Sequence, residues 1–451
     1  MSLSSVSALD EEPLAALPGA LDAYWIPFTP NRDFKSEPRL VARAKGMYYY
    51  DPAGRPIIDG VSGLFACAAG HGREEIADAV HQQLKTLDYS SSFYRSHPLA
   101  FEAASAIARL TPAGLDRVFF ANSGSEAVDS AMKIILAYHR ARGEGQRTIF
   151  VSRERAYHGV NFGGVSLSGL PNNRRKFSGL ITPAPLLRHT WLAENAFSQG
   201  QPEKGHDLAE DLLRQINNHG AENIAAVFVE PIAGSTGVLV PPKGYLERLR
   251  SICDQHGLLL VFDEVITGFG RTGKAFAAQS FGVRPDIITL AKAITNGAQP
   301  MGAVVVDRKI HDTVVSGAPE GEIELFHGYT TSAHPAACAA SLAALAIYER
   351  ENLFERGAEL SAYFQERVFS LADLPVISDI RSYGLIAGIE LLPLSAPGRR
   401  GYQVQKALFD AGLHLKTTGD VAILAPALVA EHKHIDEIVD VLRRVLSRQN
   451  P

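Results

Sequence analysis

Short apolar runs alternate with segments of helical periodicity from about residue 60 to about residue 325, and this alternation constrains the fold more than any other feature of the sequence. The runs have the length of buried strands and lie at 118–121, 149–151, 224–229, 258–262, 287–290 and 303–306. Helical segments between them include 125–142, 208–218 and 244–256. Apolar strands that alternate with helices are typical of a mostly parallel sheet buried on both faces. We therefore expect an α/β fold with a mostly parallel central sheet and helices on both faces.

The periodicity changes after an alanine-rich helical segment at 336–349. A further helix, a hairpin-like stretch at 381–391 and two more helices at about 402–411 and 431–447 predict a smaller α+β domain. Before residue 60, the run YYYDPAGRPIID predicts a hairpin around Pro52, Ala53 and Gly54. The expected organisation is an N-terminal segment (1–60) that packs with the small domain, a large α/β domain (61–325) and a C-terminal small α+β domain (326–451).

Composition supports a folded chain with a sizeable core. The chain has 451 residues, of which 46% are hydrophobic and 21% charged, so it does not resemble disordered sequences. Its 39 glycines and 25 prolines stay well below the share of about 25–30% that marks low complexity. Lys and Arg number 44 against 49 Asp and Glu, a net charge of −5, which argues against a nucleic-acid partner.

Cysteine spacing and hydropathy indicate the compartment. Cys67, Cys253 and Cys338 are far apart and odd in number, so neither a disulfide framework nor a zinc site is expected. The first 25 residues carry acidic side chains where a secretory signal needs basic ones. No apolar run approaches the length of about 18 residues that a membrane span requires. These features predict a cytoplasmic protein with no membrane association.

Polar residues follow the predicted strands at the points where the strands end. They are the NSGSEA segment at 122–127, Glu230, Asp263, Glu264 and Lys292. In an open α/β sheet, ligands bind outside the carboxyl ends of the strands. We therefore expect these polar groups to converge on one edge of the sheet and to form the functional site there.

The NSGSEA segment places small hydroxyl residues just before a predicted helix. The free N–H groups and the positive dipole at such a helix start favour an anion. Gly124 permits a close approach of the backbone, and Ser123 or Ser125 can donate to a phosphate. An ordinary helix cap with a capping glutamate is the alternative interpretation.

Asp263 and Lys292 each lie at the mouth of a predicted buried strand. A carboxylate there needs a partner such as a cation or a protonated ring nitrogen, or it serves as a helix cap or in a structural ion pair. A desolvated lysine has a lowered pKa and suits Schiff-base chemistry, whereas a lysine that extends to the solvent is the usual alternative. Tyr157 and His158, which follow the strand at 149–151, can stack on a planar ligand or belong to a packed surface loop.

Two other patterns do not predict sites. The run GFGRTG at 268–273 matches a dinucleotide-binding pattern, but Asp263, Glu264 and three further residues separate it from the strand. Asp286 opens the next strand, whereas a ribose-binding acid closes one. The run HKH at 432–434 lies in a predicted exposed helix without acidic partners, so no metal site is expected.

Several motifs in fixed order resemble the class III (omega) aminotransferases, which use pyridoxal phosphate on the fold-type I scaffold. These motifs are FVEPIAGSTGVLVPPKGYL, LVFDEVITGFGRTG, TLAKAITNGAQPMGAV and HGYTTSAHP. The resemblance extends from about Trp25 to the C-terminus. Within the family it is strongest to the β-alanine (omega-amino acid):pyruvate aminotransferases, as judged by LDAYWIPFTPNRDFK, AYHRARGEG and LAENAFSQGQP.

The resemblance implies a role for each matching residue. It makes Lys292 the lysine that forms a Schiff base with the cofactor and Asp263 the partner of the pyridine nitrogen. The remaining implied cofactor-binding residues are Ser123, Gly124 and Ser125 at the phosphate, Tyr157 with His158 and Val265 at the ring, Glu230 near the ring hydroxyl, and Thr330 at the phosphate of a neighbouring subunit. The resemblance thus implies a homodimer with shared active sites, and a tetramer is left open.

The implied substrate pocket departs from the family pattern. Its residues are Trp25, Phe65, Phe93, Arg95, Tyr157 and Lys416. Lys416 stands where close relatives usually carry a carboxylate-binding arginine, and Phe65 stands where a tryptophan is common. Tyr94 and Arg95 replace a pair that is usually uncharged, so Arg95 is a candidate substitute for that arginine. Neutral drift is one explanation, and a pocket remodelled for a bulkier or more anionic amine donor is the other.

The implied activity is transamination with pyridoxal phosphate. A terminal amine or omega-amino acid gives its amino group to the cofactor, leaving pyridoxamine phosphate as the intermediate, and pyruvate or another 2-oxo acid then accepts it. The two half-reactions predict ping-pong kinetics. An aminomutase or a decarboxylase on the same cofactor is the alternative, and a non-catalytic cofactor-binding module is a third interpretation.

Overall fold

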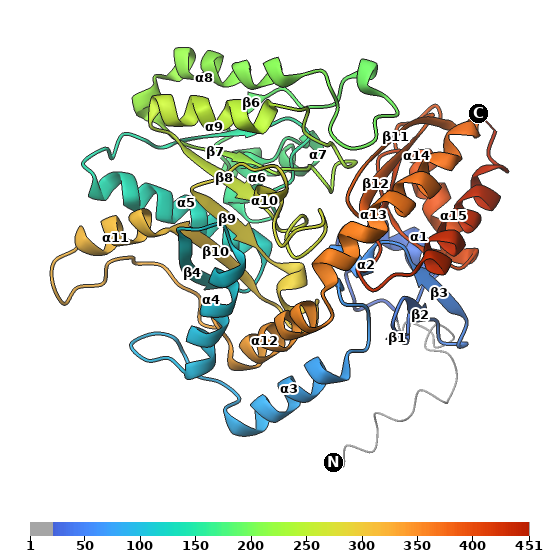
Figure 1. Cartoon of the computed structure of the whole chain (residues 1–451), viewed down its shortest axis with the longest axis horizontal. Helices are drawn as coiled ribbons and strands as arrows, with labels where there is room; N and C mark the ends of the chain where they lie inside the picture. Colours follow the sequence, from blue (N-terminus) through green and yellow to red (C-terminus); the bar gives the residue numbers. More distant parts are fainter. Residues whose placement is uncertain (1–20, 451) are drawn as a thin grey trace.

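A seven-stranded sheet forms the centre of the molecule, with strand order β4-β10-β9-β8-β7-β5-β6 (Figure 1). The computed structural model describes residues 21–450, so part of the predicted N-terminal segment lies outside the described residues. The strands are β4 (Leu115–Ala121), β5 (Ile149–Arg153), β6 (Leu186–Leu187), β7 (Ile224–Val229), β8 (Leu259–Asp263), β9 (Ile287–Leu290) and β10 (Gly302–Asp307). Strands β6, β5, β7, β8 and β9 pair in parallel, whereas β10 runs antiparallel to both β9 and β4.

Alternate residues of the central strands pack against helices on opposite faces of the sheet. Leu259 and Val261 of β8 belong to the core on one face, and Leu260 and Phe262 belong to the core on the other. This alternation follows from the two-residue period of a strand. The first face is covered by α5 (Gly124–Ala141), α6 (Phe162–Leu167) and α11 (Arg308–Ser316). The second face is covered by α4 (Pro98–Leu110), α8 (Asp211–His219), α9 (Tyr245–His256) and α12 (Pro335–Arg350).

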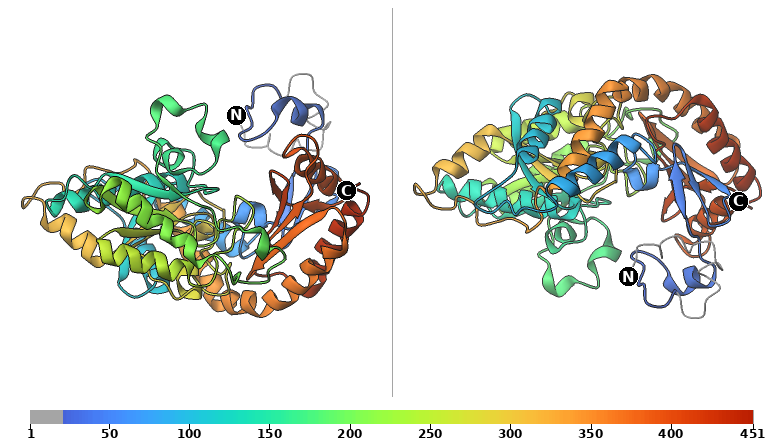
Figure 2. Two further views of the ribbon diagram at one scale, coloured as in Figure 1. Left: turned by 90° about the horizontal axis from the view of Figure 1, so that it is seen from above. Right: turned by 90° about the horizontal axis from the view of Figure 1, so that it is seen from below.

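A second, antiparallel sheet lies beside the large one, with order β11-β12-β15-β14 (Figure 2). Its strands are β11 (Ile377–Tyr383), β12 (Ile386–Leu391), β14 (Lys416–Thr418) and β15 (Val421–Leu424). The strands β11 and β12 form the expected hairpin. The helices of this part are α13 (Leu353–Phe369), α14 (Arg399–Asp410) and α15 (His432–Leu446).

The N-terminal residues join this C-terminal part through a third sheet. Strands β2 (Tyr48–Tyr50) and β3 (Pro56–Asp59) form the hairpin that the sequence predicts, and β1 (Arg43–Lys45) lies at its edge. On the other side of β3 lies β13 (Leu413–His414), which pairs with it in parallel. Segments more than 350 residues apart in the sequence thus share one sheet. The division of the chain at residues 60 and 325 stays a prediction.

The other elements are short helices and α3 (Glu74–Thr86), which packs against α12. The short helices are α1 (Asn31–Ser36), α2 (Ser62–Phe65), α7 (Pro171–Arg174), α10 (Ala277–Ser280), and the single-turn η3 (Ser178–Leu180), η4 (Ala193–Asn195), η5 (His206–Glu210), η6 (Ala221–Asn223), η7 (Lys292–Thr295) and η8 (Ser370–Asp373). No helix among residues 21–450 is both long and apolar enough to cross a bilayer.

The expected α/β architecture is confirmed, with one strand direction that the sequence did not indicate. All six apolar runs form strands of the central sheet, and helices cover both of its faces. The reversal of β10 has no signal in its own sequence, because an apolar run has the same appearance in either direction.

We expect Leu260→Ala to lower the free energy of unfolding by about 3 kcal/mol, because truncation of a fully buried leucine leaves a cavity in the core. The control is Leu180→Ala, which truncates a leucine that is 71% exposed and is expected to cost less than about 0.5 kcal/mol. Urea unfolding of both variants measures the difference. Equal losses for the two variants would contradict the assigned core.

Candidate active site

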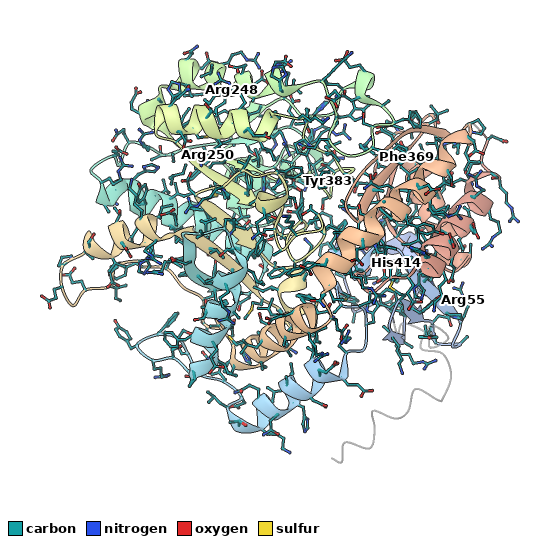
Figure 3. The ribbon with its side chains drawn as sticks, in the orientation of Figure 1. Arg55, Arg248, Arg250, Phe369, Tyr383 and His414 are labelled. Atoms are coloured by element: carbon teal, nitrogen blue, oxygen red, sulfur yellow. The ribbon has the colours of Figure 1, made fainter. Side chains whose placement is uncertain are left out.

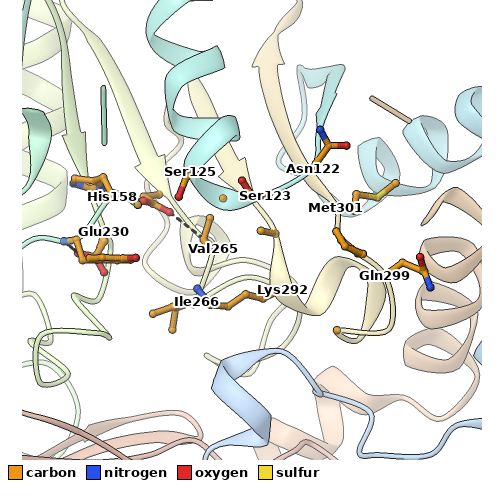
Figure 4. Close-up of a pocket in the computed structure, with 17 residues that line it drawn as sticks. Asn122, Ser123, Ser125, His158, Glu230, Val265, Ile266, Lys292, Gln299 and Met301 are labelled. Carbon is orange, nitrogen blue, oxygen red and sulfur yellow. Dashed lines mark hydrogen bonds and ion pairs between the residues drawn. The ribbon is translucent and has the colours of Figure 1, made fainter. Parts of the chain in front are cut away.

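The polar residues predicted at the strand ends meet in one pocket of about 370 Å³ at an edge of the central sheet (Figure 4). Asp263 ends β8, Glu230 follows β7, and Lys292 begins η7 just after β9. Ser123 and Ser125 lie on one side of the pocket at the start of α5, and Lys292 lies on another. The predicted cofactor-binding residues that line the pocket are Ser123, Gly124, Ser125, Tyr157, His158, Glu230, Asp263, Val265 and Lys292.

The start of α5 forms a cup with the properties of an anion site. Ser123 is the N-cap, and its Oγ accepts a hydrogen bond of 3.1 Å from the Glu126 backbone N–H. Ser125 Oγ accepts one of 3.0 Å from the Val160 N–H. Since both hydroxyls act as acceptors toward the protein, their own hydrogens can be donated into the pocket. The helix cap, which is the alternative interpretation, is therefore present. It leaves the Ser123 hydrogen available to a ligand, so the cap does not exclude the phosphate site, which stays a prediction.

Two glycines keep this cup open. A Cβ on Gly124 would lie 3.1 Å from Val265 Cγ1, across the pocket wall. A Cβ on Gly159 would lie 2.5 Å from Ser125 Oγ, and the φ of Gly159 is +99°. Larger residues would therefore push the serine hydroxyls and the wall into the space that a ligand needs.

Asp263 is a buried carboxylate held in place by two donors. His158 Nδ1 lies 2.8 Å from Asp263 Oδ2, and the Val265 N–H donates to Oδ1 at 3.2 Å. Both side chains are almost fully buried, and His158 Nε2 has no hydrogen-bond partner among the described residues. The neighbouring Glu264 lies outside the pocket lining, and its carboxylate accepts from the N–H groups of Ala277 and Ala278. Only the first of these two acids therefore faces the pocket.

Burial controls the protonation of the other two charged groups. It lowers the pKa of Lys292, although the nearby carboxylates of Asp263 and Glu230 act in the opposite direction. Burial also raises the pKa of Glu230 to about 7, with Asp263 adding to the rise. Glu230 Oε1 accepts a hydrogen bond of 2.9 Å from the Tyr157 N–H, which ties the Tyr157 loop to the end of β7. A buried lysine with a lowered pKa is a stronger candidate for nucleophilic and proton-transfer chemistry than an exposed one.

Phe65 and Lys416 lie beside this pocket, next to each other. Lys416 Nζ is 5.8 Å from the centre of the Phe65 ring and donates to the Ser235 carbonyl at 3.1 Å. Burial, together with the charge of Lys292, lowers the pKa of Lys416 to about 8. Lys416 is therefore electrostatically coupled to the pocket, as its predicted substrate role requires.

Besides Phe65 and Lys416, which lie beside the pocket, four further predicted site residues are absent from its lining within this chain. Trp25 is 87% exposed, and Phe93 is 49% exposed. Arg95 and Thr330 are exposed as well, and none of the four belongs to the lining. Tyr89 donates to the Thr330 carbonyl at 2.9 Å, which fixes the backbone at the surface. Their predicted roles toward cofactor and substrate stay predictions.

The sequence interpretation missed one wall of the pocket. It is formed by the loop after η7, with Gly297, Gln299, Pro300 and Met301 in the lining. Asn296 has a φ of 53°, and its side chain bonds the Ala69 N–H at 2.8 Å and the Gly70 carbonyl at 2.9 Å. The Asn-Gly pair at 296–297 is a turn signal that could have indicated this return of the chain.

Comparisons with known proteins identify the family of the chain. The model of the family "Aminotransferase class-III" matches residues 31–446. An omega-aminotransferase of Caulobacter vibrioides is 54% identical over 95% of this chain and 98% of its own length. An omega-amino acid–pyruvate aminotransferase of Pseudomonas putida is 47% identical over 95% of this chain and 96% of its own length. The solved structure of an omega transaminase from Pseudomonas jessenii in complex with PMP has a TM-score of 0.89 and 31% identity, and the match covers 94% of this chain and 96% of that one.

The chain belongs to the class-III aminotransferase family, and it is a transaminase of the fold-type I class. Members of this family depend on pyridoxal phosphate. The residues of the pocket fit that group, because the chain provides an anion cup, a buried carboxylate and a buried lysine around one cavity. Among residues 21–450, no cluster of three or more His, Cys, Asp or Glu side chains could hold a metal ion.

We expect Gly159→Ala to weaken the binding of pyridoxal phosphate by about tenfold or more, because the new Cβ would collide with Ser125 in the cup. The measurement is a titration of the cofactor-free protein with pyridoxal phosphate. Gly143→Ala is the matched control, since Gly143 also has a positive φ of 76° but nothing within 4 Å of its Cβ position. Unchanged affinity in Gly159→Ala, or an equal loss in both variants, would contradict the assignment of the cup.

Proposed function

We propose that this protein transfers an amino group from a terminal amine or omega-amino acid to pyruvate or another 2-oxo acid, and that it holds pyridoxal phosphate at Lys292. The observation that carries the proposal is the buried Lys292, whose ammonium is disfavoured, in one pocket with Asp263 and the start of α5. The names of the close relatives support the substrate classes, since one is an omega-amino acid–pyruvate aminotransferase.

Each group of pocket residues would contact a different part of the cofactor. Ser123, Ser125 and the free N–H groups at the start of α5 bind the phosphate. Asp263 would hold the ring nitrogen, and Glu230 would lie near the ring hydroxyl, since both line the same pocket. Tyr157 and Val265, which also line the pocket, would pack on the two faces of the ring. When bound, pyridoxal phosphate supplies a carbonyl that takes up the amino group and a ring that accepts electrons.

Asp263 keeps the proton on the ring nitrogen. A buried carboxylate stabilises a positive charge beside it, because the low dielectric of the pocket strengthens their attraction. The hydrogen bond from His158 Nδ1 and the one from the Val265 N–H hold the carboxylate in one orientation. Asp263 thereby maintains the electron-accepting form of the ring throughout the reaction.

Lys292 first attaches the cofactor and, once the amine donor has displaced it, moves a proton. A neutral amine is required for both tasks, and burial lowers the pKa of Lys292 so that the neutral form is more populated at a given pH. With the cofactor bound, the released Nζ would act first as a base that takes the proton from the substrate carbon and then as an acid that gives it back, with the roles reversed in the second half-reaction.

Lys416 binds the carboxylate of the 2-oxo acid. Its ammonium lies beside the pocket over the Phe65 ring, where no carboxylate of the chain forms an ion pair with it among the described residues. Lysine offers a point charge, whereas the arginine usual in the family offers a planar, bidentate fork. The carboxylate affinity of this enzyme therefore depends on pH in a range where arginine stays charged.

The active sites are shared between two copies of the chain. Several large side chains are exposed on one part of the surface. They are Phe93, Tyr94, Phe101, which is 67% exposed, and Phe326, which is 84% exposed. Phe93 and Phe101 line a second hollow together with Gly328 and Ala333. Exposed aromatic groups of this extent are typical of a protein interface. This surface supports a homodimer in which Thr330, Phe93 and Arg95 reach the neighbouring pocket. Whether two dimers combine, and the cytoplasmic location, stay predictions.

The acceptor requirement separates transamination from the decarboxylase and aminomutase alternatives. With β-alanine or benzylamine and no 2-oxo acid, we expect one equivalent of carbonyl product per site and then no further reaction, because the amino group stays on the cofactor. Addition of pyruvate should restore turnover. A rapid-mixing assay that follows product and cofactor absorbance measures both stages. Continued turnover without an acceptor would contradict the proposal.

The matched variants for this assay are Lys292→Ala and Lys274→Ala. The first removes the proton-transferring amine and should lower turnover by a factor of at least about 10³. It should also abolish the visible absorbance band of the protein-bound cofactor. The second removes an exposed lysine and should leave both unchanged. Full turnover in Lys292→Ala would contradict the assigned role.

The KM for pyruvate should rise about tenfold between pH 7 and pH 9, because Lys416 loses its charge as the pH passes its pKa of about 8. In Lys416→Arg the group stays charged in this range, so the KM of that variant should be nearly constant. Steady-state kinetics at several pH values compare the two enzymes, which share every other titrating group. Parallel profiles would show that Lys416 does not bind the carboxylate.

A further inference from the structure

The segment that carries Phe65 has an unusual backbone. Ser62 and Phe65 have φ angles of 44° and 65°, and Gly63 between them has a φ of 73°. The left-handed region is unfavourable for residues with a side chain, and it persists only where surrounding contacts hold it. The segment 60–67 therefore needs anchors, and the anchors decide where the Phe65 ring lies.

Asp59, the last residue of β3, is the first anchor. Its carboxylate accepts hydrogen bonds from the Val61 N–H at 3.0 Å and from the Gly63 N–H. The side chain is 2% exposed, so these bonds do not compete with water. One carboxylate thus fixes two backbone groups of the segment that precedes Phe65.

His71 completes this anchor from the far side of the segment. Its Nε2 lies 2.7 Å from Asp59 Oδ2, and the Tyr49 ring packs on the imidazole with 4.4 Å between ring centres. The pKa of His71 is raised to about 9, since the contacts with Asp59 and Cys67 outweigh the opposing effect of burial. His71 is therefore charged at neutral pH and forms a buried ion pair with Asp59.

The C-terminal part holds the same segment from another direction. His414, labelled in Figure 3, lies with Nε2 3.2 Å from the Gly63 carbonyl and packs edge-on to Tyr49. The Ser62 hydroxyl donates to the Ala425 carbonyl at 2.7 Å and accepts from Arg271 Nη2 at 2.9 Å. Ser62 is thus held by the C-terminal part and by Arg271 of the loop after β8, whereas Gly63 depends on Asp59 and His414.

We propose that Asp59, paired with His71, is a positioning residue that fixes the Phe65 wall of the substrate pocket beneath Lys416 and thereby sets which amine donors fit. The side chain of Asp59 is absent from the cofactor pocket, so it acts through the backbone of 61–65 and not by contact with the reacting atoms. The inference rests on the proposed function, because it takes Phe65 and Lys416 as part of the substrate pocket.

The test is Asp59→Asn in the complete holoenzyme. Asp59 makes three hydrogen bonds, with the Val61 N–H, the Gly63 N–H and His71. The NH₂ group of asparagine would face an N–H donor, so at least one of these bonds is lost although the side chain keeps its size. Asp211→Asn is the matched control. Asp211 is also a buried carboxylate, and it accepts hydrogen bonds from the backbone N–H and from the guanidinium of Arg188. Asp211 lies on α8, outside the pocket lining.

The kinetic readout is the ratio of kcat/KM for benzylamine, a bulky terminal amine, to that for β-alanine, with pyruvate as acceptor. We expect Asp59→Asn to change this ratio by about tenfold through KM, with pyridoxal phosphate affinity within about twofold of the original. Asp211→Asn should leave the ratio unchanged even if it lowers stability. An unchanged ratio in Asp59→Asn, or equal changes in the two variants, would overturn the inference.

A spectroscopic readout tests the same role without turnover. Phe65→Trp places an indole in the wall, and Trp25 and Trp191 give a constant background. Adding Asp59→Asn to this reporter should shift its emission to longer wavelength, whereas adding Asp211→Asn should not. If the unmodified enzyme transfers no amino group from any terminal amine or omega-amino acid to a 2-oxo acid, the proposed function is wrong, and the reporter alone then decides the inference. An unshifted emission with Asp59→Asn would then overturn the inference.

Discussion

The structure depends on the burial of three charged side chains, Asp263, Glu230 and Lys292, at one edge of the central sheet. A single buried charge is strongly unfavourable, so each of these groups is either paired or shifted toward its neutral form. Asp263 stays paired with His158, Glu230 has its pKa raised to about 7, and Lys292 has its pKa lowered. Only parallel strands that end at the same edge can bring the three groups together without long, mobile connections. The electrostatics of the pocket is therefore a consequence of the strand order β9-β8-β7.

Much of the fold and of the cofactor side of the site could be predicted, because both depend on local sequence. A buried strand is an apolar run, and its end is visible where Asp263 or Lys292 interrupts that run. The loop at 296–301 was missed because its position depends on the side chain of Asn296, which bonds backbone groups some 226 residues away. The direction of β10 also depends on its partners and not on its own residues.

The substrate side was harder to predict for a different physical reason. Phe65 and Lys416 are brought together by the pairing of β3 with β13, a contact between the two ends of the chain. Trp25, Phe93, Arg95 and Thr330 lie at the surface of a single chain, so their roles depend on contacts that one chain does not contain. Local sequence patterns carry no information about such contacts, and only the resemblance to a family pointed to these residues.

The two sides of the site therefore rest on different parts of the molecule. The cofactor side is built from strand ends and from the start of α5, where a change in any one element disturbs the buried charges. The proposed substrate side is built on the strained segment 61–65, which is held by Asp59 and His71 from one side and by residues of the C-terminal part from another. A substitution such as phenylalanine at position 65 or lysine at position 416 can alter the pocket wall without moving Asp263 or Lys292. Under the proposed function, this separation of supports allows the substrate pocket to change while Asp263 and Lys292 keep their positions.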